Sequence, residues 1–318
     1  MNTSILIGIG AGLASALLFL SVTTGNPAAV VLFYAAPLPL FIAGFGWGLF
    51  PVLVAAGVAV VTTVIATHFI FSGIYAVSCA APCVWLVRLA LLSRPLDESD
   101  PQGPREWYPA GRLVLWTAAL GACVAIAAII TFGGTAENYA RTIDTVFREL
   151  FKVSGNPFPA EANPDVLIAI MTRFLAPVSA ALWALFTLFN MWLAIRIATM
   201  SGQAIRPSIG IRDMRFPPQA SAAFAAALAG AFVGGTLGLY AKAVLGALVA
   251  VFAVLGVAVL FGLTRGMAAQ PLILAAMVLL AVFMAPLFVA IVALIGISDT
   301  VFNFRNQRGG PPATPGSE

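Results

Sequence analysis

The stretch AVLGALVAVFAVLGVAVLFGL, residues 243–263, contains no charged side chain over its whole length. An α-helix of about 20 apolar residues is long enough to cross the ~30 Å hydrocarbon core of a bilayer. A transmembrane β-strand would instead alternate polar and apolar residues over ~10 positions, and this run shows no alternation. The stretch therefore predicts a membrane-spanning α-helix.

Similar uncharged runs recur along the chain of 318 residues, which is 61% hydrophobic and only 9% charged. Soluble domains carry about 25% charged residues, so this composition excludes a water-soluble fold. We expect an all-α, polytopic transmembrane helix bundle that forms a single domain over residues 1–305, followed by a disordered Gly- and Pro-rich tail, 306–318. The apolar runs predict about nine spans, within a range of eight to ten, near residues 5–22, 28–45, 48–66, 71–92, 112–132, 174–197, 220–240, 243–263 and 271–297.

Arginines near the ends of the spans predict the orientation of the chain in the membrane. They cluster around the connections 93–111 and 198–219, which we therefore expect on the cytoplasmic side together with the N-terminus. Counting spans places the C-terminus outside, whereas Arg305 and Arg308 favour the cytoplasm. A bend at Pro286 would account for an error of one span, so the side of the C-terminus stays open.

Residues 136–153, AENYARTIDTVFRELFKV, predict an amphipathic helix between the fifth and sixth spans. At 100° per residue, its polar and apolar side chains separate onto opposite faces. Such a helix lies flat at the membrane interface or packs over the mouth of the bundle. It is either a structural belt or a lid over a ligand cavity. The apolar face carries Tyr139, Ala140, Ile143, Val146, Phe147, Leu150, Phe151 and Val153.

Few polar side chains fall inside the predicted spans, and polar groups at that depth indicate function by default. Asn190 lies within the sixth span, where it forms either an interhelical hydrogen bond or a ligand contact. His68 and Tyr75 flank the start of the fourth span. A single histidine has no second ligand for a metal, so we interpret His68 as an interfacial residue. These three residues, Asn190, Tyr75 and His68, are the candidate ligand-binding set.

Glycines spaced four residues apart allow two helices to approach closely, within the protein or against a partner. The predicted packing positions are Gly8, Gly12, Gly44, Gly48, Gly230, Gly234 and Gly238. Paired carboxylates within the spans, a G-x-S-x-G serine and a Walker A sequence are all missing from the sequence. We therefore expect a protein that is not an enzyme, with no catalytic residues, cofactor or metal site. The small, dispersed net charge also argues against binding of nucleic acid.

The last predicted span runs into LIGISDTVFNFR, residues 294–305. Read as a helix, this stretch continues the span as an amphipathic turn with phenylalanines at headgroup depth. Its pattern resembles the C-terminal signature of the YybS-like family, which are bacterial multi-pass membrane proteins of unknown function. The segments 190–217 and 37–48 resemble the middle and early parts of that family. The residues that match the signature are Gly296, Asp299, Asn303, Phe304 and Arg305.

The resemblance implies a docking role for the C-terminal motif and a place in the bacterial inner membrane. Asn303 departs from the family pattern, because an acid is common at that position. The family is distantly similar to the S-components of energy-coupling-factor transporters. That similarity implies solute binding or a transport-related role with an unknown membrane or cytoplasmic partner. The alternative is a cell-envelope scaffold or assembly factor. A closed cavity lined by Asn190 and aromatic residues would favour the first function, and a solid core with an exposed groove the second.

Overall fold

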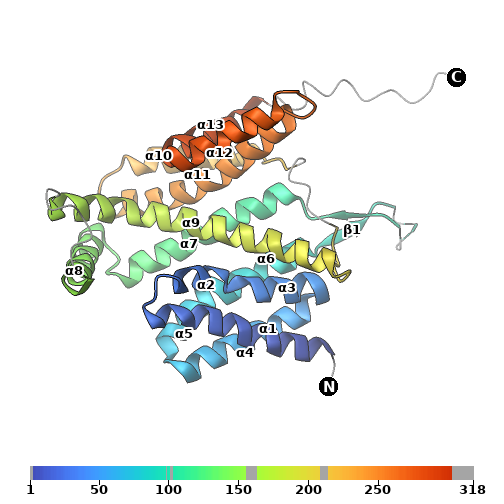
Figure 1. Ribbon diagram of the computed structural model, residues 1–318, viewed down its shortest axis with the longest axis horizontal. Coiled ribbons are helices and arrows are strands. Elements are labelled where there is room, and N and C mark those ends of the chain that lie inside the picture. Colours follow the sequence, from blue (N-terminus) through green and yellow to red (C-terminus); the bar gives the residue numbers. More distant parts are fainter. Residues whose placement is uncertain (1–2, 98, 101–102, 155–162, 208–213, 303–318) are drawn as a thin grey trace.

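The computed structural model describes residues 3–97, 99–100, 103–154, 163–207 and 214–302. Within these ranges the fold is almost entirely helical and confirms the expected all-α bundle (Figure 1). Eight helical segments of the described chain are long and apolar enough to cross a bilayer, which lies within the predicted range of eight to ten. They are Thr3–Thr24, Ala29–Trp47, Leu49–Ala66, Phe69–Ala90, Ala110–Thr131, Asp165–Met200, Gly235–Leu263 and Ala285–Phe302.

The N-terminal part of the chain forms one compact group of helices around its own apolar core. Its core residues include Ala16, Phe41, Ala55 and Leu86, all with no exposed surface. Few of the described helices in this group begin with a capping polar side chain. The chain instead changes direction at glycine and proline residues, for example at Gly48, whose φ is +98°. The elements are α1 (Thr3–Leu20), η1 (Ser21–Thr24), α2 (Ala29–Ala35), α3 (Pro37–Trp47), α4 (Leu49–Ala66), α5 (Phe69–Tyr75), the short π-helix η2 (Ala76–Ala80) and α6 (Ala81–Ala90).

The second half of the chain forms a second group of helices. A short antiparallel hairpin, which the sequence did not predict, joins the two groups and pairs Ser93 with Trp107. The elements that follow α6 are β1 (Ser93–Pro95), β2 (Arg105–Trp107), α7 (Ala110–Thr131), α8 (Ala136–Ser154), α9 (Pro164–Met200), α10 (Gln219–Ala231), α11 (Gly235–Leu263), α12 (Gln270–Phe283) and α13 (Ala285–Phe302).

The long helix α9 is shared by the two groups and crosses the middle of the molecule (Figure 1). Ala176, Ala180 and Ala184 belong to the core around α7 and α11. Further along, Met191 and Ala194 belong to the N-terminal core. One helix therefore supplies a wall to each half, and a side chain on α9 can contact both.

Two predicted spans differ from the structure because helix breakers act where hydropathy stays high. Residues 220–240 do not form one span, since Gly235 adopts a φ of +69° and separates α10 from α11. With 13 residues, α10 is roughly 20 Å long, too short to cross the hydrocarbon core. Residues 271–297 likewise divide at Met284 into α12 and α13. Pro286 lacks an N–H, and its ring excludes the carbonyl of the preceding turn.

The predicted amphipathic helix is present as α8. Tyr139 and Ile143 are buried, and the helix packs on α9 and α11. It is tied to α11 by a hydrogen bond from the Ala136 N–H to Thr236 Oγ1 at 3.1 Å. The side chain of Arg148 bonds Asp165 at 2.7 Å, which fixes α8 to the start of α9. These contacts hold α8 as a structural element of the second half.

The predicted packing glycines occupy different environments. A Cβ atom at Gly8 would lie 2.8 Å from the Val54 side chain, and one at Gly12 would lie 2.5 Å from the Ala55 carbonyl oxygen. These two glycines therefore bring α1 against α4 inside the protein. Gly44 faces α6, Gly230 faces α11 and Gly238 faces the Val233 carbonyl, whereas Gly48 is a turn residue and Gly234 has open space around it.

Candidate functional site

The junction between α2 and α3 is the point where polar side chains from three helices meet. Asn190 of α9 is 3% exposed, and its Nδ2 donates hydrogen bonds to the carbonyl oxygens of Tyr34 at 2.8 Å and Phe186 at 2.7 Å. Both amide protons are therefore used within the protein. This geometry is the one that an interhelical hydrogen bond requires, because Tyr34 lies on α2 and Asn190 on α9.

A second polar pair holds the same junction from the side of α1. Ser15 Oγ donates to the carbonyl oxygen of Ala36 at 2.6 Å and lies 2.7 Å from the Tyr75 hydroxyl. Since the Ser15 proton goes to the carbonyl, the Tyr75 hydroxyl donates to Ser15. Tyr75 has no exposed surface and packs edge-on against Phe19, with ring centroids 4.9 Å apart. It is a core residue in this structure.

His68 lies apart from Asn190 and Tyr75. It is the exposed N-cap of α5, where its Nδ1 accepts a hydrogen bond from the Phe71 N–H at 3.4 Å. The three residues of the sequence-predicted ligand set therefore do not form one site. The α2–α3 junction joins two of them indirectly, through the backbone carbonyls of Tyr34 and Ala36.

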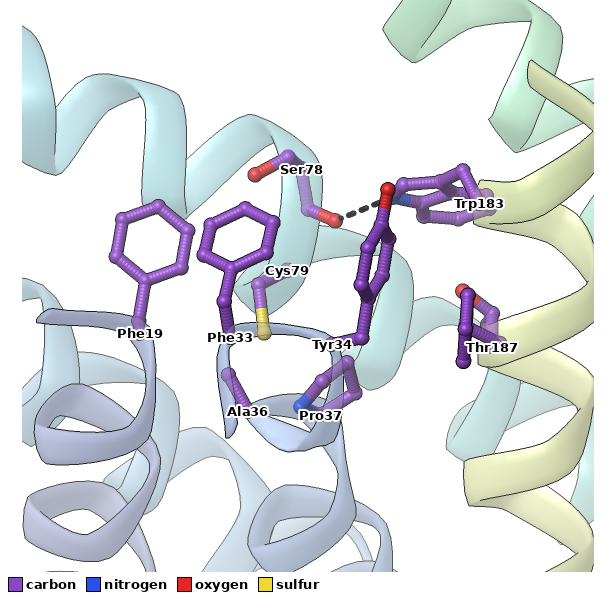
Figure 2. Close-up of a pocket in the computed structure, with 10 residues that line it drawn as sticks. Phe19, Phe33, Tyr34, Ala36, Pro37, Ser78, Cys79, Trp183 and Thr187 are labelled. Atoms are coloured by element: carbon purple, nitrogen blue, oxygen red, sulfur yellow. Dashed lines mark hydrogen bonds between the residues drawn. The ribbon is translucent and has the colours of Figure 1, made fainter. Parts of the chain in front are cut away.

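A small aromatic cavity adjoins this junction (Figure 2). Its volume is about 40 Å³, which has room for a few water molecules and not for a vitamin-sized solute. Trp183 of α9 anchors one wall, because its Nε1 donates to the Ser78 carbonyl in the π-helix η2 at 2.9 Å. None of the lining residues comes from α8. They are Phe19, Phe33, Tyr34, Ala36, Pro37, Ser78, Cys79, Trp183, Phe186 and Thr187.

A larger hollow runs along the outer face of α9, between α7 and α11. Its volume is about 400 Å³, and it is a groove rather than a closed chamber, since Phe189 is 54% and Trp192 is 45% exposed. Its described lining is apolar except at one end, where Arg196 lies. It is lined by Val114, Leu185, Leu188, Phe189, Met191, Trp192, Ile195, Arg196, Met214 and Val254.

Sequence reasoning missed this groove, although α9 carries a signal for it. Leu185, Leu188, Trp192 and Arg196 recur at spacings of three and four, which places them on one face of a helix. In a membrane-spanning helix, such an apolar stripe can face the protein core, the lipid or a groove. Only the positions of α7 and α11 show that this face is hollowed.

A buried arginine links the two groups of helices at the hairpin end. Arg206 is 7% exposed, and its guanidinium donates to the carbonyl oxygens of Ala90 and Tyr108, each at 2.9 Å. It also lies over the Trp107 ring, 5.9 Å from the centroid. Burial lowers the pKa of this guanidinium from its ordinary value. In the sequence, Arg206 is only one of several arginines in a predicted loop. No motif around it indicates that it connects the two groups of helices.

The C-terminal motif is described only up to Phe302, so Asn303, Phe304 and Arg305 lie outside the described residues. Gly296 packs against α11, where an added Cβ would lie 2.2 Å from the Phe252 carbonyl oxygen. Asp299 follows one turn later and is 4% exposed. The acid is therefore enclosed by protein and is not a solvated group at the membrane surface.

The Asn190 amide provides a first test of the α2–α3 junction. Replacing Asn190 by leucine should lower the free energy of unfolding by about 1 kcal/mol, because the interhelical hydrogen bond to the Tyr34 carbonyl is lost together with the bond to Phe186 within α9. Thermal unfolding of the purified protein measures this change. Thr131→Ala is the control, since the Thr131 hydroxyl is exposed and bonds only its own helix, to the Ala127 carbonyl. Equal midpoints for both variants would contradict the assignment.

Comparison of the chain with protein-family models, curated proteins and solved structures finds no match. The function is therefore inferred from the geometry of the chain itself, in which the apolar groove on α9 is ten times larger in volume than the aromatic cavity.

Proposed function

We propose that this integral membrane protein is a binding protein without catalytic activity, which takes its ligand from the bilayer through the groove on α9. This assignment is a form of the solute-binding or transport-related role that the resemblance to S-component-like proteins implies. The observation that carries it is the groove itself. Its volume of about 400 Å³ lies in the range of small-molecule sites, ~300–1,000 Å³.

The position of the groove supports a functional role for ligand binding. A ligand there touches α7, α9 and α11, and α9 is also built into the core of the N-terminal half. Binding is thereby coupled to the packing of the two halves, which an unknown partner protein can sense. The aromatic cavity does not serve the same purpose, because about 40 Å³ holds only a few water-sized groups.

A second candidate function, a cell-envelope scaffold or assembly factor, is favoured by a different hollow. It has a volume of about 480 Å³ and lies between the β1–β2 hairpin and the start of the spanning helix α7. Its lining is more polar than that of the α9 groove and includes Arg94, Glu106, Trp107 and Arg112. Such a surface suits a protein partner in water, on the side that the arginine pattern predicts to be cytoplasmic.

Native mass spectrometry of the gently solubilised protein tests the proposed function. We expect a retained molecule of lipid size, which Leu185→Trp should remove, because the indole fills the groove. Leu185 is 37% exposed, so the larger side chain is accommodated in the folded protein. Leu182→Trp is the matched control, since Leu182 is 38% exposed on the same helix and does not line the groove. A retained protein in place of a small molecule would favour the scaffold.

A further inference from the structure

We infer that the ligand of the α9 groove is a phospholipid with a net negative headgroup, whose acyl chain lies along α9 and whose phosphate binds Arg196. The inference rests on the proposed function and adds to it the chemical class and orientation of the ligand. Three features of the groove carry it: its length, the one cation among its described lining residues, which lies at one end, and the size of its lining side chains.

The length of the groove matches one leaflet of the bilayer. Leu185 and Arg196 are eleven positions apart on α9, which corresponds to about 16 Å along the helix axis. The hydrocarbon core is ~30 Å thick, so the groove covers about half of it. Arg196 lies four residues before the end of α9 at Met200, and the arginine pattern of the sequence predicts this end of the helix at the cytoplasmic border of the membrane. A lipid of that leaflet therefore has its chain beside Leu185 and its headgroup beside Arg196.

The charge at the border end selects the headgroup. Arg196 is exposed, and among the described residues no carboxylate forms an ion pair with it. A guanidinium presents a planar pair of donors that fits two phosphate oxygens. Trp192 lies one turn deeper and is half-exposed, at the level where amphipathic rings meet headgroups. A zwitterionic headgroup carries its own cation and gains less from Arg196.

The lining favours a flexible acyl chain over a helix of a partner protein. Helices pack in membranes through small residues that let their backbones approach. This chain follows that rule at Gly12, which meets Ala55, and at Gly256, which meets Val292. The described lining of the groove, in contrast, contains none of these small residues and consists, apart from Arg196, of leucine, isoleucine, valine, methionine, phenylalanine and tryptophan. Large side chains leave narrow, irregular spaces that a bent chain fills and a helix does not.

The test uses the full-length protein in nanodiscs that contain equal amounts of phosphatidylglycerol and phosphatidylcholine. After release into the mass spectrometer, we expect the wild type to retain the anionic lipid about fivefold over the zwitterionic one. Arg196→Gln should remove this preference, and Arg196→Lys should retain most of it. Arg173→Gln is the matched control, because Arg173 is an exposed arginine near the other end of α9. Inorganic phosphate should not displace the lipid.

The outcomes separate the inference from the proposed function. Equal retention of both lipids by the wild type, or an unchanged preference in Arg196→Gln, would overturn the anionic assignment. If Leu185→Trp still abolishes retention of both lipids in that case, the groove remains a lipid site and the proposed function stands. If Leu185→Trp also leaves retention unchanged, the proposed function fails as well.

Discussion

Replacing Gly256 by valine is expected to destabilise the protein more than any other substitution considered, by about 3 kcal/mol or more. An added Cβ at this position would lie 1.7 Å from the Val292 carbonyl oxygen on α13. At Gly296, on the same interface, an added Cβ would lie 2.2 Å from the Phe252 carbonyl oxygen on α11. The two helices therefore touch backbone to backbone, and no flexible side chain can move aside.

Thermal unfolding of the purified protein, followed by tryptophan fluorescence, measures this loss. Gly57→Val is the matched control, because Gly57 also lies within a spanning helix, α4, and has no atom within 4 Å of an added Cβ. The control should unfold near the wild-type midpoint or slightly above it, since valine has a higher intrinsic helix propensity than glycine and the added Cβ meets no neighbouring atom. If Gly256→Val and Gly57→Val unfold at the same temperature, the close contact between α11 and α13 is wrong.

Replacing Arg206 by alanine is expected to lower the free energy of unfolding by about 2 kcal/mol. The guanidinium satisfies two backbone carbonyls, of Ala90 at the end of α6 and Tyr108 before α7. Without it, both oxygens lose a charge-assisted hydrogen bond, which is buried at Ala90 and partly buried at Tyr108. Part of the loss is offset because a buried charge is removed at the same time. We therefore expect a net effect near that of one charged hydrogen bond.

Limited proteolysis at the hairpin and thermal unfolding together measure the effect of Arg206. Arg206→Lys should recover little of the stability, because a single ammonium group does not reproduce the two-pronged geometry of the guanidinium. Arg94→Ala is the control, since the Arg94 side chain is 79% exposed in its ion pair with Glu106 and such pairs contribute at most about 1 kcal/mol. If the Arg206→Ala protein is as stable and as protease-resistant as Arg94→Ala, Arg206 does not hold the two groups of helices together.

The membrane class and most of the helices followed from the sequence alone. Uncharged runs such as 243–263 exclude water as the surrounding solvent, and in a bilayer each such run has to satisfy its own backbone hydrogen bonds as a helix. The amphipathic helix was also predictable, because residues 136–153 lie between water and apolar surroundings. In each case the signal is local, since it depends only on neighbours along the chain.

The boundaries around α10, α11, α12 and α13 were harder to predict. Hydropathy stays high through Gly235 and Met284, so the apolar runs looked continuous. The backbone at Gly235 leaves the helical region at a φ of +69°, and Pro286 interrupts the helix beside Met284. Glycine and proline occur in many uninterrupted membrane helices, because neighbouring helices satisfy the freed backbone groups. Whether they end a helix is therefore decided by the packing around them.

The site was decided by tertiary structure for a physical reason that is specific to membranes. In water, the buried face of a helix is apolar and the exposed face is polar, so periodicity identifies the core. In a bilayer both faces are apolar, and Leu185 in the groove has the same kind of side chain as Leu182 beside it. Likewise, nothing along the chain distinguishes the buried Arg206 from surface charges. Sequence by itself determined which segments enter the membrane, and the packing of α9 between the two halves decided which of their faces meet protein, lipid or ligand.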